Sequence, residues 1–385
     1  MIHTPVCIVG AGPAGLVASL FLSKHGVAHT IFERKKEIGD KVCGECYDGR
    51  LANVFNKLDT SLLPRMLAAQ VLQPIEQYQY FNHRGKGLYI DAAKHNAVSR
   101  YSTYRKDFDT FLRAEVLKSP LVTLKTGEAV NNIVANENSV ALITPNASIN
   151  SALAIVATGN LSILANNTRQ ALPDHFLLAA RGYYRHLHIT EPHGFQVYLI
   201  NKPVNGYLFI NKLPKGLYTV EMFILKQNAN KYGYNAEALL QDVIKNQPQV
   251  SRIMANAVLV EKIKGASLPS TANKLQRFSS ERVLLAGSSG SGVNPLTGWG
   301  VGHAVFQGMC AAEQCITSLQ AQQYNAAFLQ QYDERIKKSL QNDWQKSQQV
   351  DFIMRYLHKS TGRFIGYAAS NNYLNRIAEK AIVGV

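Results

Sequence analysis

The stretch PVCIVGAGPAGLVASLFLSKHGVAHTIFER, residues 5–34, decides the fold. Its pattern is an apolar strand, a glycine-rich turn, a helix and a second strand. In such a unit Gly10 makes the tight turn, Gly12 lets a pyrophosphate approach the backbone, and Gly15 lets the helix pack closely on the strand. The pattern therefore predicts a dinucleotide site. The alternative is that the glycine turn occurs by chance in an ordinary α/β unit that binds no nucleotide.

An acidic residue stands where such a site would need one. Glu33 ends the second strand, where its carboxylate can accept hydrogen bonds from ribose hydroxyls, which favours the unphosphorylated ribose of FAD or NAD. The phosphates would lie on the helix N-terminus at Pro13 and Ala14. We assign these residues and the adjacent Arg34 to the dinucleotide site.

Length and composition describe a globular protein. The 385 residues are enough for about two domains, with 46% hydrophobic and 17% charged residues. No apolar stretch approaches the roughly 18 residues of a membrane span. The first strand starts at Val6, which leaves no room for a signal peptide, and five cysteines are more consistent with reduced thiols than with a disulfide scaffold. We therefore expect a cytoplasmic protein.

The formal net charge of +15 is unusual. No compact Lys/Arg block alternates with aromatic residues, so we expect no nucleic-acid partner. A diffuse solubilising charge is one explanation. Peripheral contact with a membrane surface is the other, because residues 353–385 combine basic and aromatic side chains with a single acid. These side chains are Arg355, Lys359, Arg363, Arg376 and Lys380, the aromatic and apolar Phe364, Ile365, Tyr367 and Tyr373, and the acid Glu379.

Further elements follow from periodicity and turn residues. The patterns predict helices at 51–72, 104–117, 234–245, 301–319 and 324–357, and strands at 121–134, 139–145, 152–156 and 281–287. A hairpin is expected at 77–90, and a meander of strands at 195–200, 207–212 and 217–225. The alternation in the meander predicts one polar and one apolar face, as in a sheet that covers a pocket.

The predicted domain organisation is discontinuous. The nucleotide-binding domain comprises residues 1–75, 95–175 and 276–320. Residues 76–94 and 176–275 form an inserted antiparallel sheet domain, and residues 321–385 a C-terminal helical region. The expected fold class is α/β, a Rossmann-like domain of the GR2 type with a second sheet inserted into it.

The order of motifs resembles FAD-dependent aromatic-ring hydroxylases of the p-hydroxybenzoate hydroxylase type and the related geranylgeranyl reductases. The likeness rests on residues 10–15 with Glu33, on Arg105 with Asp107, Phe108, Asp109 and Leu112, and on residues 155–159 and 282–302. Two further strings, Lys41-Val42-Cys43-Gly44-Glu45 and Ala180-Arg181-Gly182-Tyr183-Tyr184, resemble the geranylgeranyl reductase branch.

The resemblance implies FAD as cofactor and a set of residues around it. Arg105 would contact the flavin side or the phosphates, and the loop at 295–298 would border the isoalloxazine. The other residues that it assigns to the cofactor are Cys43, Gly44, Val130, Ala157, Thr158, Gly159, Gly287, Ser288, Pro295, Gly298, Trp299, Gly300 and Val301.

Several positions depart from the family pattern. Ser288 stands where the family usually has Asp, and it can offer the ribityl chain no charge-assisted hydrogen bond. The usual Tyr-x-Trp-x-Phe-Pro string is replaced by Tyr207 to Lys212, and Trp299 replaces a common acid. The substrate is therefore expected to differ from the prenyl lipid of the reductases.

Catalytic candidates are Cys43, Tyr207 and His303. Cys43 and Cys46 form a CxxC, but no second ligand pair accompanies it, so we expect no metal site, and a disulfide relay is the lesser alternative to a thiol that lines the flavin pocket. His303 opens the helix after the flavin loop and is a better candidate than His83, His175, His193 and the pair His186 and His188. The last two alternate on one strand face, where a half-exposed histidine is more often a surface residue than a catalytic one.

Three functions remain open at this point. One is an FAD-dependent reductase of a hydrophobic small molecule, in which NAD(P)H reduces the flavin and Cys43 or Tyr207 supplies a proton. The second is a monooxygenase of an aromatic or polyketide substrate, which a dry pocket would serve equally well. The third, prompted by Ser288, is a flavin-poor ligand-binding protein. The sequence leaves the oligomeric state open.

Overall fold

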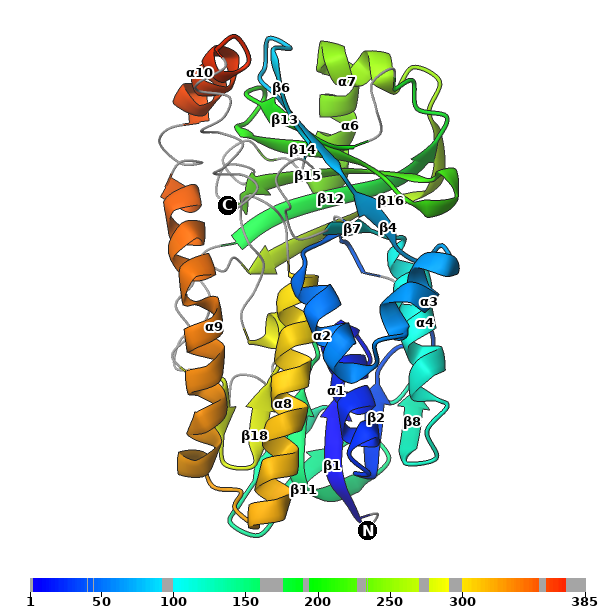
Figure 1. The fold of residues 1–385 in the computed structure, drawn as a ribbon, viewed down its shortest axis with the longest axis vertical. Coiled ribbons are helices and arrows are strands. Elements are labelled where there is room, and N and C mark those ends of the chain that lie inside the picture. The colour runs from blue at the N-terminus through cyan, green and yellow to red at the C-terminus, as the bar shows by residue number, and fades with distance from the viewer. Residues whose placement is uncertain are drawn as a thin grey trace.

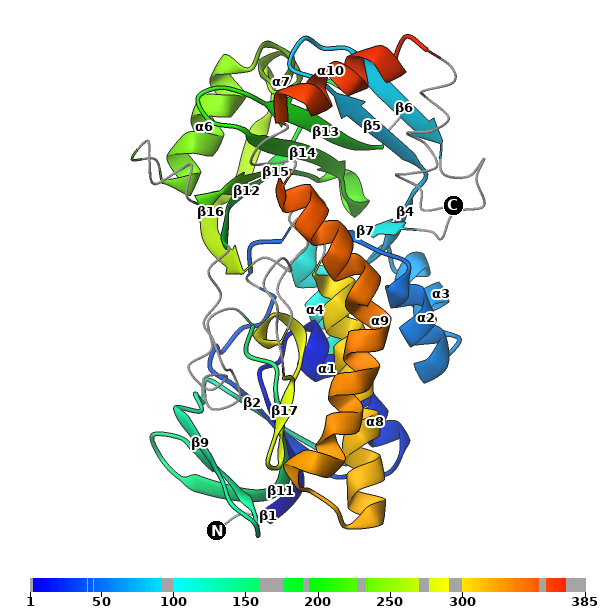
Figure 2. The same cartoon turned by 90° about the vertical axis from the view of Figure 1, so that its left-hand side faces the viewer.

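In the computed structural model two sheets lie at opposite ends of the long axis of the molecule (Figure 1). The structure describes residues 3–39, 41–43, 45–91, 100–159, 176–189, 194–226, 233, 235–269, 277–290, 300–352 and 358–371. The long helix α9 (Ala326–Phe352) runs along one side of the molecule, as the perpendicular view also shows (Figure 2). No helix in these ranges is long and apolar enough to cross a membrane.

The first sheet is built around β1 (His3–Val9), which pairs in parallel with β2 (His29–Glu33) and β11 (Ser148–Val156). The strand order is β17-β18-β11-β1-β2-β8, with β9 and β10 attached to β11. The other strands are β8 (Val122–Thr126), β9 (Asn132–Ala135), β10 (Val140–Ile143), β17 (Ser279–Ser280) and β18 (Val283–Leu285). Ile8 and Val9 lie in separate apolar clusters, so β1 is buried on both faces, as its continuous apolar sequence predicts.

Helices cover one face of this sheet. The helix α1 (Pro13–Lys24) follows the glycine turn and packs against α8 (Val301–Ala321), from the other end of the sequence. The contact is close, because a Cβ added to Gly308 would lie 2.2 Å from the carbonyl oxygen of Ala14. Next to α1 lies α4 (Arg105–Val116), which buries Phe108 and Leu112 as predicted. The Rossmann-like α/β fold expected from residues 5–34 is thus confirmed.

The second sheet has the order β16-β12-β15-β14-β13-β5-β6 and confirms the predicted meander and hairpin. Its strands are β5 (Gln77–Phe81), β6 (Gly87–Asp91), β12 (Phe176–Arg185), β13 (Phe195–Ile200), β14 (Gly206–Lys212), β15 (Tyr218–Leu225) and β16 (Val258–Pro269). All neighbouring pairs are antiparallel except β13 and β5, which are parallel. The helices α6 (Ala236–Asn246) and α7 (Pro248–Ile253) pack beside it, and η3 (Pro214–Gly216) joins β14 to β15.

The prediction of one polar face for the meander is wrong. Tyr207 and Phe209 lie in one apolar cluster, and the alternate residues Leu208 and Ile210 lie in another. The second cluster also takes in Leu239 and Leu240 of α6, so helices cover the face that was expected to meet water. The apolar residues at both alternating positions of β14 are explained by this two-sided burial.

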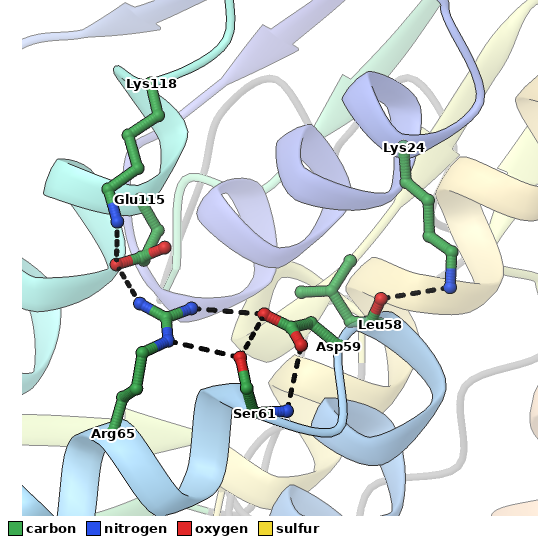
Figure 3. Close-up of polar contacts among 7 residues, drawn as sticks. All are labelled: Lys24, Leu58, Asp59, Ser61, Arg65, Glu115 and Lys118. Atoms are coloured by element: carbon green, nitrogen blue, oxygen red, sulfur yellow. Dashed lines mark hydrogen bonds and ion pairs between the residues drawn. The ribbon is translucent and has the colours of Figure 1, made fainter.

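The prediction of a single helix at 51–72 is also wrong. The structure has two helices there, α2 (Arg50–Leu58) and α3 (Leu62–Ala68). Asp59 is extended, with φ −160°, and its carboxylate accepts hydrogen bonds from the Ser61 N–H and Oγ at 2.8 and 2.9 Å (Figure 3). Lys24 donates to the last carbonyls of α2, including that of Leu58 at 2.9 Å. Asp and Ser in this arrangement favour a turn over a continuing helix.

Two smaller regions complete the described fold. A three-stranded sheet, β3-β7-β4, which the sequence did not predict, joins the units and consists of β3 (Cys46–Tyr47), β4 (Gln73–Ile75) and β7 (Arg100–Ser102). The predicted strand at 121–134 is divided at Gly127, whose φ is +77°. The helix α10 (His358–Ala368) docks on β5 and β6, far from the parallel sheet (Figure 2).

Candidate functional site

A cavity of about 710 Å³ lies between the carboxyl ends of the parallel strands and the antiparallel sheet. Most of the residues that sequence reasoning assigned to the cofactor line it. These are Gly10, Gly12, Pro13, Ala14, Glu33, Arg34, Cys43, Arg105, Ala157, Thr158, Gly159, Gly287, Ser288, Gly300 and Val301. Residues 10–34 and 287–301 are thus brought together from opposite ends of the chain, at the place where open α/β sheets bind ligands.

The glycine turn has no room for side chains at two of its positions. Gly10 has φ +106°, and a Cβ there would lie 2.4 Å from the carbonyl oxygen of Ala157. A Cβ at Gly15 would lie 2.0 Å from the carbonyl oxygen of Gly10. At Gly12 the nearest atom to an added Cβ is Nη2 of Arg105 at 4.0 Å, so the turn is open toward the cavity where a pyrophosphate would approach.

The carboxylate of Glu33 is fixed at the cavity wall by backbone donors. The Ala11 N–H donates to one oxygen and the Lys35 N–H to the other, each at 2.9 Å. An ionised carboxylate has about four lone-pair sites, so acceptor capacity remains for two hydroxyl groups. The orientation suits the ribose contact that the sequence predicted.

Two cationic side chains enter the cavity from α4 and from the loop after β2. Arg105 is buried, with Nε 2.8 Å from the Asp109 carboxylate, which itself is buried. Burial and the nearby Arg105 lower the pKa of Lys41 to about 8. Both residues line the cavity, where a polyanionic ligand would relieve their mutual repulsion.

The loop after β18 is tied to the end of β11. Gly287, with φ +69°, opens the short helix η4 (Gly287–Ser289). The Gly159 N–H donates to Oγ of Ser289 at 3.0 Å, and the Thr158 hydroxyl lies 3.2 Å from the same oxygen. The neighbouring Ser288 lines the cavity.

The open turn at Gly12, the fixed Glu33, the buried Arg105 and the half-buried Lys41 fit the ADP half and the phosphates of FAD. The predicted contacts at Gly44, Pro295, Gly298 and Trp299 lie outside the described residues. Gly15 packs inside the turn instead of lining the cavity, and Val130 packs against the apolar cluster of β1 and β11.

Of the three catalytic candidates, only Cys43 is among the described residues that line the cavity. Its Sγ lies 3.9 Å from the Tyr47 hydroxyl, and burial, followed by the nearby Glu45, raises the pKa of its thiol to about 11. Tyr207 is buried in the second sheet, and His303, in the first turn of α8, is also buried. Across the described part of the chain no cysteine forms a disulfide, and no His, Cys, Asp or Glu cluster could hold a metal ion.

Sequence reasoning missed the other wall of the cavity. Glu221 and Phe223 on β15 line it, as do Lys262 and Lys264 on β16 and Glu237 on α6. The signal for Glu221 is a single acid inside the apolar run Tyr218–Leu225. This residue is completely buried.

Behind this wall lies a polar cluster that joins the two units through Glu45. The Tyr183 hydroxyl donates a short hydrogen bond to the Glu45 carboxyl, and Asn211 Nδ2 donates to the Glu45 carbonyl at 3.0 Å. Arg181 stacks on the Tyr183 ring at 3.8 Å and donates to the Lys41 carbonyl at 3.2 Å. Burial raises the pKa of Glu45 to about 8, against the opposing effect of Arg181.

Comparison with known proteins gives one family and several relatives. The FAD binding domain family matches residues 3–343. A digeranylgeranylglycerophospholipid reductase from Methanococcus vannielii is 25% identical over 388 residues, which cover 97% of this chain and 89% of the relative.

Solved structures share the fold. A geranylgeranyl bacteriochlorophyll reductase-like protein from Thermoplasma acidophilum has a TM-score of 0.80 at 18% identity, covering 95% of this chain and 91% of that one. The p-nitrophenol 4-monooxygenase of Pseudomonas putida has a TM-score of 0.78 at 16% identity, covering 99% of this chain and 98% of that one.

Proposed function

The chain belongs to the FAD binding domain family and is an FAD-dependent oxidoreductase, and from this premise we propose that it reduces a carbon–carbon double bond in a hydrophobic small molecule. The observation that carries the proposal is the cavity. One wall is the glycine turn with Glu33 and Arg105, and the other is the antiparallel sheet with Phe223. A ligand between the two walls would lie next to a flavin bound at the first.

The residues of the first wall have distinct tasks in this proposal. Glu33 binds the adenosine ribose, and Arg105 and Lys41 neutralise the phosphates. Bound flavin supplies hydride chemistry, with NAD(P)H as the proposed reductant from solution. Phe223 and Leu268 give the other wall an apolar part beside its charged residues, which suits a substrate with an apolar portion.

Reduction is preferred to oxygen insertion because of the string around Cys43. The curated relatives of similar length are named as reductases of a digeranylgeranyl phospholipid, and this chain carries Lys41-Val42-Cys43 at the cavity.

Monooxygenation is the second candidate. It is favoured by β14, which has Tyr207, Phe209 and Asn211 in place of the reductase-type aromatic string, so that a smaller or more polar ring could be the substrate.

Product analysis separates the two reactions. FAD-reconstituted protein would be incubated with NADH or NADPH and a panel of polyprenyl, polyene and phenolic compounds, with and without oxygen. We expect a product that gains two hydrogen atoms under anaerobic conditions. A product that gains one oxygen atom, and only in air, would replace the reductase proposal by the monooxygenase.

We also propose peripheral membrane contact through α10. Ile365 and Ala368 are buried against the second sheet, whereas Phe364 and Tyr367 are 42% and 69% exposed beside the exposed Arg363. Such a mixture suits an anionic lipid surface. Co-sedimentation with phosphatidylglycerol vesicles should decrease on Phe364→Glu, and equal sedimentation of both proteins would refute the contact.

A further inference from the structure

Glu221, a buried acid on the antiparallel sheet, lines the cavity. Glu221 lies on β15, where its register neighbours are Arg181 on β12 and Phe209 on β14. It is completely buried and lines the cavity together with Phe223 from the same strand. Cys43, from the opposite unit, is close enough for the charge of Glu221 to affect its thiol.

Neither carboxyl oxygen of Glu221 has a hydrogen-bond partner in the part of the chain that the structure describes. The nearby Arg181 directs Nη2 to the Lys41 carbonyl at 3.2 Å, and its Nη1 lies 3.9 Å from the Glu261 carboxylate. The other neighbour, Glu45, is a second buried acid. An ionised carboxylate in this position would be buried without any compensating bond, which is strongly unfavourable.

Burial without a hydrogen-bond partner therefore favours the neutral form of the Glu221 carboxyl group. Burial, reinforced by Glu45, raises its pKa well above the ordinary value, and Arg181 opposes this only in part. A neutral carboxyl carries an O–H that no described protein group receives. Both carboxyl oxygens are covered by protein atoms, so the side chain has to rotate toward the cavity, which the residue lines, to give this proton to a bound molecule.

On the basis of the proposed double-bond reduction, we propose that Glu221 is the acid that protonates the substrate. One carbon of the double bond takes a hydride, with its electron pair, from the reduced flavin, which becomes oxidised. The π electrons of the broken double bond form the second C–H bond with the proton of Glu221, which is left as a carboxylate and regains a proton from water. Arg181 is close enough to stabilise this transient carboxylate.

The geometry favours Glu221 over the two acids suggested by the sequence. Tyr207 is not among the described residues of the cavity lining, and burial raises the pKa of its phenol. Cys43 does line the cavity, but burial and then the nearby Glu45 raise the pKa of its thiol to about 11. Glu45 also raises the pKa of Glu221, against the opposing effect of the Arg181 guanidinium.

The first test needs neither flavin nor substrate. Infrared difference spectra near neutral pH should show the carbonyl stretch of a protonated carboxyl group in the wild-type protein that is lost in Glu221→Gln. The control Glu334→Gln removes an exposed acid on α9 and should leave that band intact. A wild-type spectrum identical to that of Glu221→Gln would overturn the proposal.

The second test follows single turnovers. Glu221→Gln should bind FAD and accept electrons from NAD(P)H within about twofold of wild type, while product formation falls on the order of 100-fold. Glu221→Asp, which keeps an acid, should recover part of the rate. It also allows the comparison with wild type to be made if Glu221→Gln fails to fold.

The outcomes distinguish this proposal from the one on which it rests. Wild-type protein that reduces no double bond in the panel removes both. Wild-type protein that reduces the substrate while Glu221→Gln does so equally fast removes Glu221 alone as the proton donor.

Discussion

Glu45 links pH to stability, because its pKa is raised to about 8 from an ordinary 4.5, chiefly by burial. Between these values the unfolded chain releases the proton and the folded chain keeps it. The stability contributed by the neutral group is complete below about pH 4.5 and is lost as the pH rises toward 8. We expect urea unfolding of the wild type to show a free energy that decreases over this window.

The variant Glu45→Gln tests the assignment, because an amide does not ionise. Its unfolding free energy should decrease less between pH 5 and pH 8 than that of wild type. Glu334→Gln, on the exposed face of α9, should keep the wild-type slope. Parallel slopes for wild type and Glu45→Gln would show that Glu45 is ionised in the folded protein.

Ser288 is the second residue for which we predict a measurable effect, in this case on the affinity for FAD. It lines the cavity where the family resemblance places an Asp that binds the ribityl chain. A charge-assisted hydrogen bond exceeds a neutral one by about 1 kcal/mol, so Ser288→Asp should lower the Kd for FAD by roughly fivefold. Titration calorimetry measures this, and ADP, which has no ribityl group, is the control ligand whose affinity should not change. Equal or weaker FAD binding by the variant would contradict the assignment.

At the scale of elements, the contact between α1 and α8 depends on Gly308. Alanine there gains helix propensity of about 1 kcal/mol, but its Cβ would lie 2.2 Å from the Ala14 carbonyl oxygen in the backbone of α1. We expect Gly308→Ala to lower the unfolding free energy by about 1–3 kcal/mol, since the helices must separate.

Gly362 in α10 is the matched control. A Cβ there would meet its nearest atom at 3.4 Å, an ordinary contact, so Gly362→Ala should be neutral or stabilising by up to about 1 kcal/mol. Urea unfolding of both variants gives the comparison. Similar destabilisation by the two substitutions would mean that the loss at Gly308 does not come from the helix contact.

Local patterns predicted individual elements well where one periodicity dominated. The β1 strand and the helices α4 and α8 fall where their apolar spacing indicated. The split at Asp59 could have been anticipated from the Asp-Thr-Ser turn chemistry, but the apolar residues on both sides of it suggested one helix. The two-sided burial of β14 depends on α6, which lies elsewhere in the sequence and therefore leaves no signal within the strand.

At the scale of the whole molecule, the cofactor half of the site was predictable and the opposite wall was not. The glycine turn and Glu33 carry a motif whose spacing has one main physical explanation. Glu221 and Phe223 line the cavity only because the fold brings β15 and residues 41–43 to the same cavity, a tertiary arrangement that no local pattern encodes. A lone acid in an apolar strand was the available signal.

The segment around Glu45 holds the two units together, and this gives a prediction for a residue far from the glycine turn. The Glu45 carbonyl accepts hydrogen bonds from the Thr103 N–H at 3.1 Å and from Asn211 Nδ2, on the antiparallel sheet, at 3.0 Å. Asn211 is 1% exposed, so Asn211→Ala loses a buried bond worth about 0.5–1.5 kcal/mol. Since Lys41 and Cys43 of the cavity wall lie four and two residues before Glu45, we expect FAD affinity to fall severalfold.

Lys215→Ala is the control for Asn211→Ala, because it removes a contact between the same two units at the surface. Lys215 Nζ lies 2.7 Å from the Asp107 carboxylate but its side chain is 52% exposed, and such ion pairs contribute about 0–1 kcal/mol. FAD titration and limited proteolysis would be compared for both variants. Increased cleavage near residues 41–47 and weaker FAD binding in Asn211→Ala alone would place the coupling in the buried bond. The same FAD affinity in all three proteins would show that the antiparallel sheet does not hold the flavin wall in place.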